Sequence, residues 1–489
     1  MRKRHKIISF ILTILLVLTS VSGVVLGNEQ ASRKLDSSAI DEFMANEIER
    51  LKIPGASLAI VEGDRVEYVQ GYGVANQNGT EMTSETPIVL GSVSKSFTAL
   101  ALMQLVDQGK IRLQDPVQLY IPWFHLDDKE ASRKITIQHL LNHTSGLSTY
   151  DGQVAISQGD KTLKEHVKGL AEIELKHPAG DRYEYSNLNY NILGLVIEEV
   201  TNLSYKDYLN EFIFKPLEMK NTYADPKDVA NHAIAGGYQT VFGWKLPTKQ
   251  LKHEGSVPSG YIISSAEDMA NYMIAQLNHG TFNGKGILSK NGMNTLHQPS
   301  SYIGDDTYYA MGWEVKDDEI SHNGWTENTY SKVILDGQYG ISLQINSMDY
   351  FNLNEYDSII SGVNKLVHHE EPPSPTDHPF MKYAVIDLII LGFVTLIVWS
   401  VYRIFKPKSR EVHGFLRILH MMFLVMVYWL IPLSILINFP YLFGPLSTVT
   451  LFAPGIGHLL FGLPLLLLIV GVVTLGKGIR TARKTHLNA

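Results

Sequence analysis

Three apolar segments near the C-terminus restrict the fold of this chain more than any other feature of its sequence. They cover residues 383–405, 418–439 and 451–475. A helix needs about 20 apolar residues to cross the hydrocarbon core of a bilayer, and each segment is at least that long. In lipid every backbone polar group must be paired within the protein, which a helix achieves by itself. We therefore expect three transmembrane helices within residues 383–475.

Charged residues around these segments predict their orientation. The loop after the second segment, PYLFGPLSTVT, has no charge. The end of the first segment and the loop after it hold one acid, Glu411, against five basic residues: Arg403, Lys406, Lys408, Arg410 and Arg417. The tail, residues 476–489, has no acid and four basic residues: Lys477, Arg480, Arg483 and Lys484. Because basic loops stay in the cytoplasm, we expect the first loop and the tail inside and residues 28–367 outside.

The N-terminus predicts the same orientation independently. The stretch MRKRHKIISFILTILLVLTSVSGVVLG has a basic start, an apolar run and then small residues, which is the layout of a secretory signal. This signal would occupy residues 1–27 and be cleaved near Gly27, or be retained as an anchor. Residues 368–382 hold four prolines and predict a stiff linker before the first apolar segment. The expected protein is therefore a multi-pass membrane protein that contacts lipid through its C-terminal helices.

The composition excludes several classes of function. The net charge of −7 leaves no basic excess to neutralise phosphates, so no nucleic-acid partner is expected. The chain has no cysteine, which excludes disulfides, cysteine nucleophiles and thiolate metal sites. The sequence also lacks an H-E-x-x-H metal motif, a G-x-S-x-G elbow and a glycine loop for phosphate. We therefore expect neither a metal nor an organic cofactor.

Residues 28–367 predict a mixed α/β (α+β) domain. Strand-like stretches flank a turn at Glu62-Gly63-Asp64 and another at Asp336-Gly337-Gln338, so we expect a hairpin near each end. Between them, LNYNILGLVIEEV and SSAEDMANYMIAQL have helical periodicity, with Ser265 as the N-cap of the second helix. This order fits an antiparallel sheet in which the first and last strands meet, flanked by helices and a helical subdomain.

The stretch VLGSVSKSFTALALMQL, residues 89–105, holds the first candidate for chemistry. Ser92 and Lys95 are three residues apart, which places both side chains on one face of a helix. The helix N-terminus and burial both disfavour a charged lysine, and a neutral lysine can take the serine proton. By itself the stretch is explained equally well by a serine cap beside a solvated lysine. The following helix is apolar on nearly all sides, which favours a buried lysine.

Two further motifs follow Ser92 in order. Tyr185-Ser186-Asn187 comes after a Pro-Ala-Gly turn, and His322-Asn323-Gly324 leads into a strand. Four rival triplets lack these surroundings: Tyr208-Leu209-Asn210, Tyr350-Phe351-Asn352, Lys290-Asn291-Gly292 and His253-Glu254-Gly255. We therefore favour the motifs that begin at Tyr185 and His322.

With S-x-x-K, Y-x-N and H-x-G in this order, residues 36–350 resemble the serine hydrolases of the class C β-lactamase and penicillin-binding-protein group. The stretches HTSGL and YSNLNYNILGLVIEEV are also similar to sequences typical of this group. The resemblance implies that Ser92 attacks a carbonyl and forms an acyl-enzyme, while Lys95 and Tyr185 act as general base and general acid. Which of the two takes the first proton stays open.

The resemblance also implies roles around the nucleophile. Asn187 would hydrogen-bond the substrate amide or Lys95, and His322 would line the opposite wall. Gly324 would let the substrate approach the strand, and the backbone N–H groups of Ser92 and Trp325 would form the oxyanion hole. His322 stands where the antibiotic-binding members have a lysine, so a permanent positive charge is lost. This change favours amides or esters that have no carboxylate at that place.

The export signal, the hydrolase motifs and the three spans together resemble membrane-anchored peptidases that mature peptide prodrugs by removing an N-acyl-D-amino-acid cap. We therefore expect a peptidase or amidase that acts on acylated D-amino-acid or D-peptide substrates outside the cytoplasm. A β-lactamase, a D,D-carboxypeptidase or an esterase of the same group is the alternative. A non-enzymatic sensor of wall fragments is disfavoured by the complete set of Ser92, Lys95 and Tyr185, and by the short cytoplasmic segments.

Overall fold

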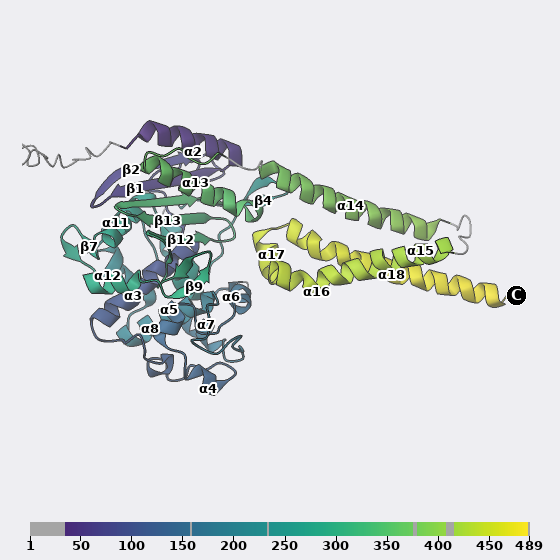
Figure 1. The fold of residues 1–489 in the computed structure, drawn as a ribbon, viewed down its shortest axis with the longest axis horizontal. Coiled ribbons are helices and arrows are strands. Elements are labelled where there is room, and N and C mark those ends of the chain that lie inside the picture. The colour runs from purple at the N-terminus through teal and green to yellow at the C-terminus, as the bar shows by residue number, and fades with distance from the viewer. Residues whose placement is uncertain (1–34, 157–158, 232–233, 375–378, 407–414, 488–489) are drawn as a thin grey trace, which may run out of the picture. The chain divides into compact units, whose positions relative to one another are not determined.

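The computed structural model describes residues 35–156, 159–231, 234–374, 379–406 and 415–487, and Figure 1 shows them in chain order. The predicted signal at residues 1–27 lies outside the described residues. The same is true of residues 375–378 in the predicted linker.

An antiparallel sheet of eight strands forms the centre of the region before the apolar helices, in the order β2-β1-β14-β13-β12-β11-β10-β9. Its strands are β1 (Gly55–Glu62), β2 (Arg65–Gly73), β9 (Ser301–Gly304), β10 (Thr307–Tyr309), β11 (Glu314–Lys316), β12 (Glu319–Trp325), β13 (Tyr330–Asp336) and β14 (Tyr339–Ile345). The predicted hairpins are confirmed, and they meet as predicted, with Ala59 of β1 opposite Ser342 of β14. Strand β1 is buried over almost its whole length, because it lies inside the sheet with helices on both faces.

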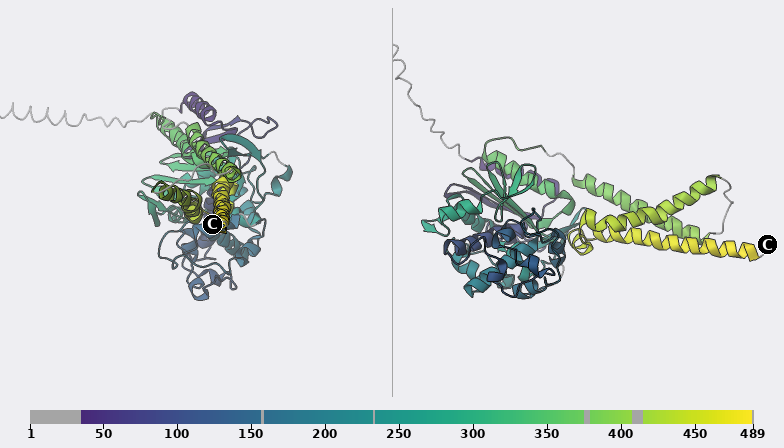
Figure 2. Two further views of the ribbon diagram at one scale, coloured as in Figure 1. Left: turned by 90° about the vertical axis from the view of Figure 1, so that its right-hand side faces the viewer. Right: turned by 60° about the horizontal axis from the view of Figure 1, so that its bottom comes forward.

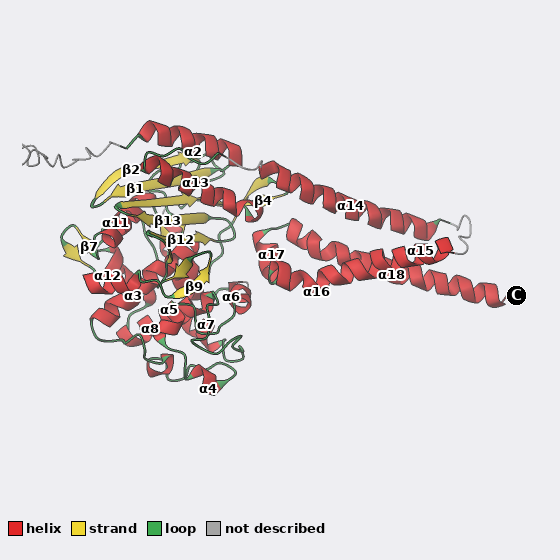
Figure 3. Ribbon diagram, in the orientation of Figure 1, coloured by secondary structure: helices red, strands yellow, loops and turns green. Residues whose placement is uncertain are grey.

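Helices cover both faces of this sheet (Figure 3). On one face lie α2 (Ser37–Leu51) and α13 (Leu353–Val367), and on the other lies α11 (Ala266–Leu277). Gly362 lets α13 approach α2 closely, since a Cβ at this position would lie 2.3 Å from the Phe43 ring. At the start of α11, the Ser265 hydroxyl accepts a hydrogen bond from the Asp268 amide at 3.2 Å, which confirms the predicted N-cap.

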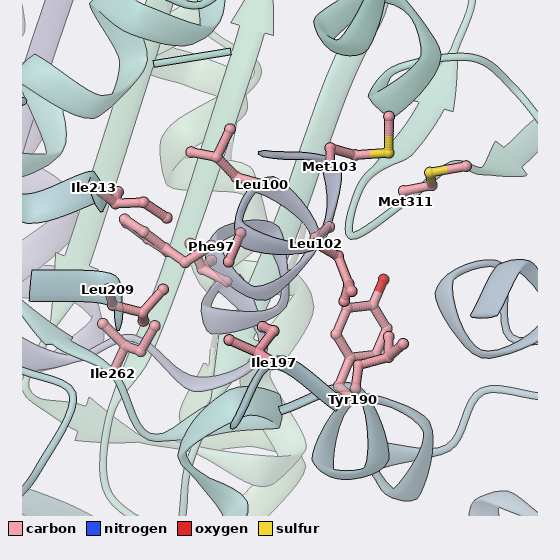
Figure 4. Packing of buried hydrophobic residues seen from close by; sticks show 14 of the residues in the cluster. Phe97, Leu100, Leu102, Met103, Tyr190, Ile197, Leu209, Ile213, Ile262 and Met311 are labelled. Carbon is pink, nitrogen blue, oxygen red and sulfur yellow. The ribbon is translucent and has the colours of Figure 1, made fainter. Parts of the chain in front are cut away.

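A helical subdomain packs around α3 (Ser94–Asp107), whose residues are buried from Ser94 to Leu105. Figure 4 shows the packing, with Phe97, Leu100 and Leu102 of α3 among side chains from other helices. The Phe97 ring stacks on Tyr272 of α11, with ring centroids 4.0 Å apart. The expected central buried helix is therefore present, and it ties the subdomain to the sheet.

Most of the other elements of this region are short, and the exception is α8 (Asn187–Thr201) with 15 residues. The helices are α4 (Lys129–Ser132), α5 (Ile137–Leu141), α6 (Thr149–Ile156), α7 (Leu163–Lys168), α8 (Asn187–Thr201), α9 (Tyr205–Leu209), α10 (Val257–Gly260) and α12 (Lys290–Leu296). Small sheets are formed by β3 (Ile88–Val89), β4 (Gly237–Val241), β5 (Trp244–Thr248), β6 (Ile263–Ser264), β7 (Thr281–Phe282), β8 (Lys285–Gly286) and β15 (Ser347–Met348). Several helices begin with a side-chain cap; Thr136 and Thr162, for example, start capping boxes at α5 and α7.

The C-terminal part contains three helices that are long and apolar enough to cross a membrane, at Pro379–Phe405, Ile418–Leu442 and Ile456–Lys477. The elements are α14 (Pro379–Phe405), α15 (Phe415–Val425), α16 (Ile431–Phe443), α17 (Leu446–Phe452) and α18 (Ile456–Leu487), with a π-helical segment at Met426–Leu430 joining α15 to α16. Helix α18 packs against α14 and α16, and Figure 2 shows this group from two further sides. At most 28% of the apolar part of any of these helices is buried inside the protein, so most of their apolar surface is uncovered.

Two boundaries differ from those expected. The apolar segment 451–475 is not one helix, because Pro454 and Gly455 (φ +80°) follow the end of α17 and separate it from α18. The first span begins at Pro379, within the predicted linker, because proline is well accommodated in the first turn of a helix.

Candidate active site

Ser92 lies in a single 3₁₀ turn, Gly91–Val93, directly before α3. The side chain of Lys95, one turn further on, places its Nζ 3.0 Å from Ser92 Oγ. Gly91 has φ +55°, and a Cβ there would lie 2.3 Å from the backbone nitrogen of Trp325. The turn therefore needs glycine at this position in order to bring Ser92 against the end of β12.

Lys95 is fully buried and its neighbours are uncharged oxygen atoms. Its Nζ lies 2.8 Å from Asn187 Oδ1 and 2.5 Å from the carbonyl oxygen of Ser259, in addition to the Ser92 contact. Burial lowers the pKa of Lys95 well below its ordinary value. A neutral amine has two N–H donors and one lone pair, which matches two accepting carbonyl-type oxygens and a donating Ser92 hydroxyl.

Tyr185 approaches Ser92 from the other side. Its hydroxyl donates a hydrogen bond to Ser92 Oγ at 2.7 Å, and Lys95 Nζ lies 4.8 Å from the centre of its ring. Burial raises the pKa of Tyr185 well above the ordinary tyrosine value, so the phenol is protonated at neutral pH. Ser92 Oγ therefore lies between an amine that can accept a proton and a phenol that can donate one.

His143, in the HTSGL stretch, holds the Tyr185 segment in place. Its Nδ1 accepts hydrogen bonds from the Ser186 amide at 3.2 Å and from Asn189 Nδ2 at 2.8 Å, and its ring centre is 4.4 Å from that of Tyr185. Burial lowers the pKa of His143 well below its ordinary value, so the ring is neutral. Thr149 adds a second support, because its hydroxyl donates to the carbonyl of Tyr185 at 2.6 Å.

The end of β12 is pressed against the turn that carries Ser92. A Cβ on Gly324 would lie 2.1 Å from the Leu90 carbonyl oxygen and 2.6 Å from the Ser92 nitrogen, so only glycine fits. Ser331, on the neighbouring strand, donates its hydroxyl to the same Leu90 carbonyl at 2.6 Å. These contacts bring the backbone nitrogens of Ser92 and Trp325 to one place.

The antiparallel ladder shows where the Trp325 N–H points. Thr326 N donates to Thr329 O at 3.0 Å, so the pair 326–329 is hydrogen-bonded. Hydrogen-bonded and non-bonded pairs alternate along such a ladder, which makes Trp325 and Tyr330 a non-bonded pair. The N–H of Trp325 is therefore directed away from β13, and the pairing of β11 with β12 ends at Ser321. A backbone N–H directed in this way can donate to a substrate oxygen.

His322 is only 2% exposed. Its Nδ1 lies 2.5 Å from the Asn323 carbonyl oxygen and its Nε2 lies 3.3 Å from the Tyr309 hydroxyl. Burial, with a smaller contribution from Lys95, lowers the pKa of His322 to about 3. The side chain expected to line the wall opposite Ser92 is thus a neutral ring packed against Tyr309.

The rival triplets lie elsewhere in the described chain. Tyr208 is in α9 and donates its hydroxyl to Gln104, while Lys290 opens α12. His253 precedes a 3₁₀ turn at Glu254–Ser256, and Tyr350 begins another after β15. The hydrogen bonds of Ser92 and Lys95 involve the motif at Tyr185–Asn187 instead.

A family model described as Beta-lactamase matches residues 38–357. This chain belongs to the β-lactamase family. Protein flp of Staphylococcus aureus strain MW2 is 28% identical over 386 residues, which cover 76% of each chain. Penicillin-binding protein 4 of Amycolatopsis lactamdurans is 29% identical over 267 residues, covering 53% of this chain and 70% of that protein.

The fold agrees with this membership. The structure of the octameric penicillin-binding protein homologue from Pyrococcus abyssi matches with a TM-score of 0.61 and 24% identity, covering 69% of this chain and 78% of that one. The family places the chain among serine hydrolases related to β-lactamases and penicillin-binding proteins, as predicted.

Among the groups that contact Lys95 and His322, two were not singled out from the sequence. The carbonyl of Ser259 and the hydroxyl of Tyr309 contact Lys95 and His322. A contact through a backbone carbonyl cannot be recognised in a sequence, because every residue has one. Tyr309 lies in a three-residue strand that contains no recognisable motif. In the described part of the chain, no three His, Asp or Glu side chains gather as a metal-binding group.

Proposed function

We propose that this β-lactamase-family member is a membrane-anchored serine hydrolase that forms an acyl-enzyme on Ser92 outside the cytoplasm. Its substrates are acylated D-amino-acid amides or D-peptides. The observation that carries the proposal is the position of Ser92 Oγ, 3.0 Å from Lys95 Nζ and 2.7 Å from the Tyr185 hydroxyl. A nucleophile between a proton acceptor and a proton donor is the arrangement that acyl transfer requires.

Lys95 acts as the first base and Tyr185 as the acid. Lys95 takes the Ser92 proton as Oγ attacks the carbonyl, and the oxyanion accepts hydrogen bonds from the N–H groups of Ser92 and Trp325. The charge that forms on Lys95, 4.8 Å from the Tyr185 ring, lowers the cost of a phenolate. Tyr185 then protonates the leaving amine and recovers its proton from Lys95. Water hydrolyses the acyl-enzyme by the same steps in reverse.

The charges in the site support substrates without a carboxylate beside His322. His322, with a pKa lowered to about 3, is neutral, and burial disfavours the charged form of Lys95, so neither offers a permanent cation there. A substrate carboxylate would lose its solvation without gaining an ion pair. Amides and esters therefore fit better than β-lactams or D-Ala-D-Ala peptides.

Anchoring and orientation rest on the C-terminal helices. Three of these helices are long and apolar enough to cross a membrane, and most of their apolar surface is uncovered. The basic residues after the first span and in the tail favour a cytoplasmic position for both, which leaves the hydrolase domain on the other side.

Active-site labelling tests the nucleophile. The full chain in lipid nanodiscs is treated with a fluorescent fluorophosphonate, beside Ser92→Ala and the exposed control Ser300→Ala. We expect labelling of the wild type and of Ser300→Ala, and none of Ser92→Ala. Equal labelling of Ser92→Ala would remove the catalytic assignment, and with it the enzyme function.

A substrate panel tests the class. We expect turnover of N-acyl-D-amino-acid amides and little turnover of nitrocefin or D-Ala-D-Ala peptides, and short-chain esters are included to detect esterase activity. The name of the Amycolatopsis relative makes penicillin binding the second candidate, so a fluorescent penicillin is included as a label. Rapid nitrocefin hydrolysis without amidase activity would replace the proposal by a β-lactamase.

A further inference from the structure

Helix α17, between the second and third spans, contacts the residue that supplies the second oxyanion donor. The Phe452 ring meets the Trp325 ring edge to face, with centroids 5.0 Å apart and planes at 86°. Phe452 is 3% exposed, so the contact is closed to solvent. An edge-to-face arrangement is one of the favoured geometries of aromatic pairs.

The same helix also contacts the segment that supports Tyr185. Thr448 of α17 donates its hydroxyl to the carbonyl of Gln153 in α6 at 3.3 Å. Helix α6 begins at Thr149, which donates to the Tyr185 carbonyl. A Cβ on Gly152, in the same helix, would lie 2.9 Å from the Asn187 nitrogen, so α6 is in direct contact with the Tyr185–Asn187 motif.

A third contact fixes the end of α17. Gln239 of β4 donates from Nε2 to the carbonyl of Leu451 at 2.5 Å. Helix α17 therefore contacts three elements outside the apolar helices: β4, α6 and the end of β12. A loop that merely connected two membrane helices would need none of them.

Trp325 depends on such support more than the rest of β12. It is the last residue of the strand, and the pairing with β11 has ended at Ser321. Among the described strands, only β13 still pairs with its backbone, through a pair whose members are not hydrogen-bonded to each other. Rotation of the Trp325 peptide would swing its N–H away from Ser92, and a fixed indole ring opposes that rotation.

We infer that α17 is an element of the active site and that Phe452 is a positioning residue for the oxyanion hole. The inference rests on the proposed acyl-enzyme at Ser92. Phe452 acts through Trp325, without touching the substrate, and it keeps the donor aligned during the reaction. Hydrolase activity is thereby coupled to the packing of the C-terminal helices, since α17 leads directly into α16 and α18.

The test compares full-length variants in nanodiscs by their rate of fluorophosphonate labelling and by kcat and KM for an N-acyl-D-amino-acid amide. Loss of a complete oxyanion donor costs about 100- to 1000-fold in kcat, so a loosened donor in Phe452→Ala should cost about tenfold. We expect the loss in kcat, with KM nearly unchanged. Phe452→Tyr keeps the ring and should restore the rate.

Two controls separate this effect from general damage. Phe423→Ala removes a ring that is 47% exposed on the second span, and it should keep the wild-type rate. Should Phe452→Ala be unstable, Thr448→Val keeps the volume and removes only the hydrogen bond to α6; it should slow labelling at an unchanged melting temperature.

The outcomes are distinct. If Ser92→Ala abolishes labelling while Phe452→Ala and Thr448→Val keep the wild-type rate, the positioning role is wrong and the hydrolase remains. An equal loss in Phe423→Ala would also overturn it, because the effect would then come from the spans in general. If Ser92→Ala labels normally, the proposed hydrolase itself fails.

Discussion

Lys95 is buried among uncharged oxygen atoms, and this environment determines the pH range in which it can accept a proton. Lysine in water has a pKa near 10.5 and is charged at neutral pH. Burial lowers the pKa of Lys95, so the neutral form is present where an exposed lysine would be protonated. The amine is therefore available as a base without a neighbouring carboxylate.

The pH dependence of labelling tests this state. We expect the labelling rate to fall as pH drops through the lowered pKa of Lys95, with a midpoint well below the ordinary lysine value of 10.5, because a protonated amine cannot accept the Ser92 proton. Rate constants measured across pH would show one protonation step. Lys95→Arg, which stays charged, should be slower by about 100-fold or more at every pH. A midpoint near 10 in the wild type would contradict a neutral Lys95.

The sequence could predict the side chains of this site better than their partners. Ser92, Lys95 and Tyr185 were predicted because each belongs to a short motif, and the structure brings them within hydrogen-bonding distance. The Ser259 carbonyl lies 164 residues from Lys95 and could not be predicted, since any residue supplies a carbonyl. Phe452 was read as part of a membrane segment, because its apolar stretch does not reveal the Trp325 ring that it contacts.

At the scale of elements, the site depends on the close approach of β12 to the turn before α3. Glycines on both sides make it possible: Gly324 on the strand and Gly91 in the turn. Neither leaves room for a methyl group. The alignment of the backbone nitrogens of Ser92 and Trp325, which are the proposed oxyanion donors, is therefore built into backbone contacts and does not depend on long side chains.

Gly324→Ala tests this contact. The new Cβ would lie 2.1 Å from the Leu90 carbonyl oxygen, so β12 must move away from the turn. We expect a folded protein whose labelling rate falls by at least about tenfold, as one oxyanion donor is displaced. Gly286→Ala, where a Cβ meets nothing within 4 Å, is the matched control. Equal rates for the two variants, with unchanged circular dichroism, would argue against the steric account.

The long elements were predictable and the short ones were not. Both hairpins and the buried α3 follow from apolar stretches of seven or more residues. The three strands β9, β10 and β11, which extend the sheet to eight, have only three or four residues each. A period of two cannot be read in so short a stretch, and their pairing depends on contacts that form after the chain has folded.

At the scale of the whole chain, the apolar segments predicted the spans but not what lies between them. The stretch PYLFGPLSTVTLFAPG has no charge and was read as a loop followed by a helix. It forms α17 instead, because Thr448, Val449 and Phe452 are buried in the folded chain. Such burial depends on the partner surface, which the sequence of this stretch does not reveal.

The first span is joined to the sheet region through a buried carboxylate. The hydroxyl of Tyr383, in α14, donates to Asp349 Oδ1. Lys245 lies 3.0 Å from Asp349 Oδ2 and 2.8 Å from the Tyr356 hydroxyl. Burial alone would raise the pKa of Asp349, but the charge of Lys245 and these hydrogen bonds lower it, so the carboxylate is ionised. A buried ion of this kind needs each of its partners.

Tyr383→Phe tests this connection. The variant keeps the ring and leaves one oxygen of a buried carboxylate without its donor, which costs about 1–3 kcal/mol of stability. We expect a lower melting temperature for the full chain in nanodiscs. Tyr402→Phe, on the same helix at a side chain that is 56% exposed, should melt like the wild type.

The stability that the Asp349 carboxylate contributes depends on pH. Because the Asp349 pKa is lowered, this stability is present above the ordinary pKa of 3.8 and is lost as pH falls through the lowered value. The difference in melting temperature between Tyr383→Phe and the wild type should therefore shrink toward acid pH. Identical melting curves for all three proteins at neutral pH would show that the Tyr383 hydroxyl does not support the carboxylate.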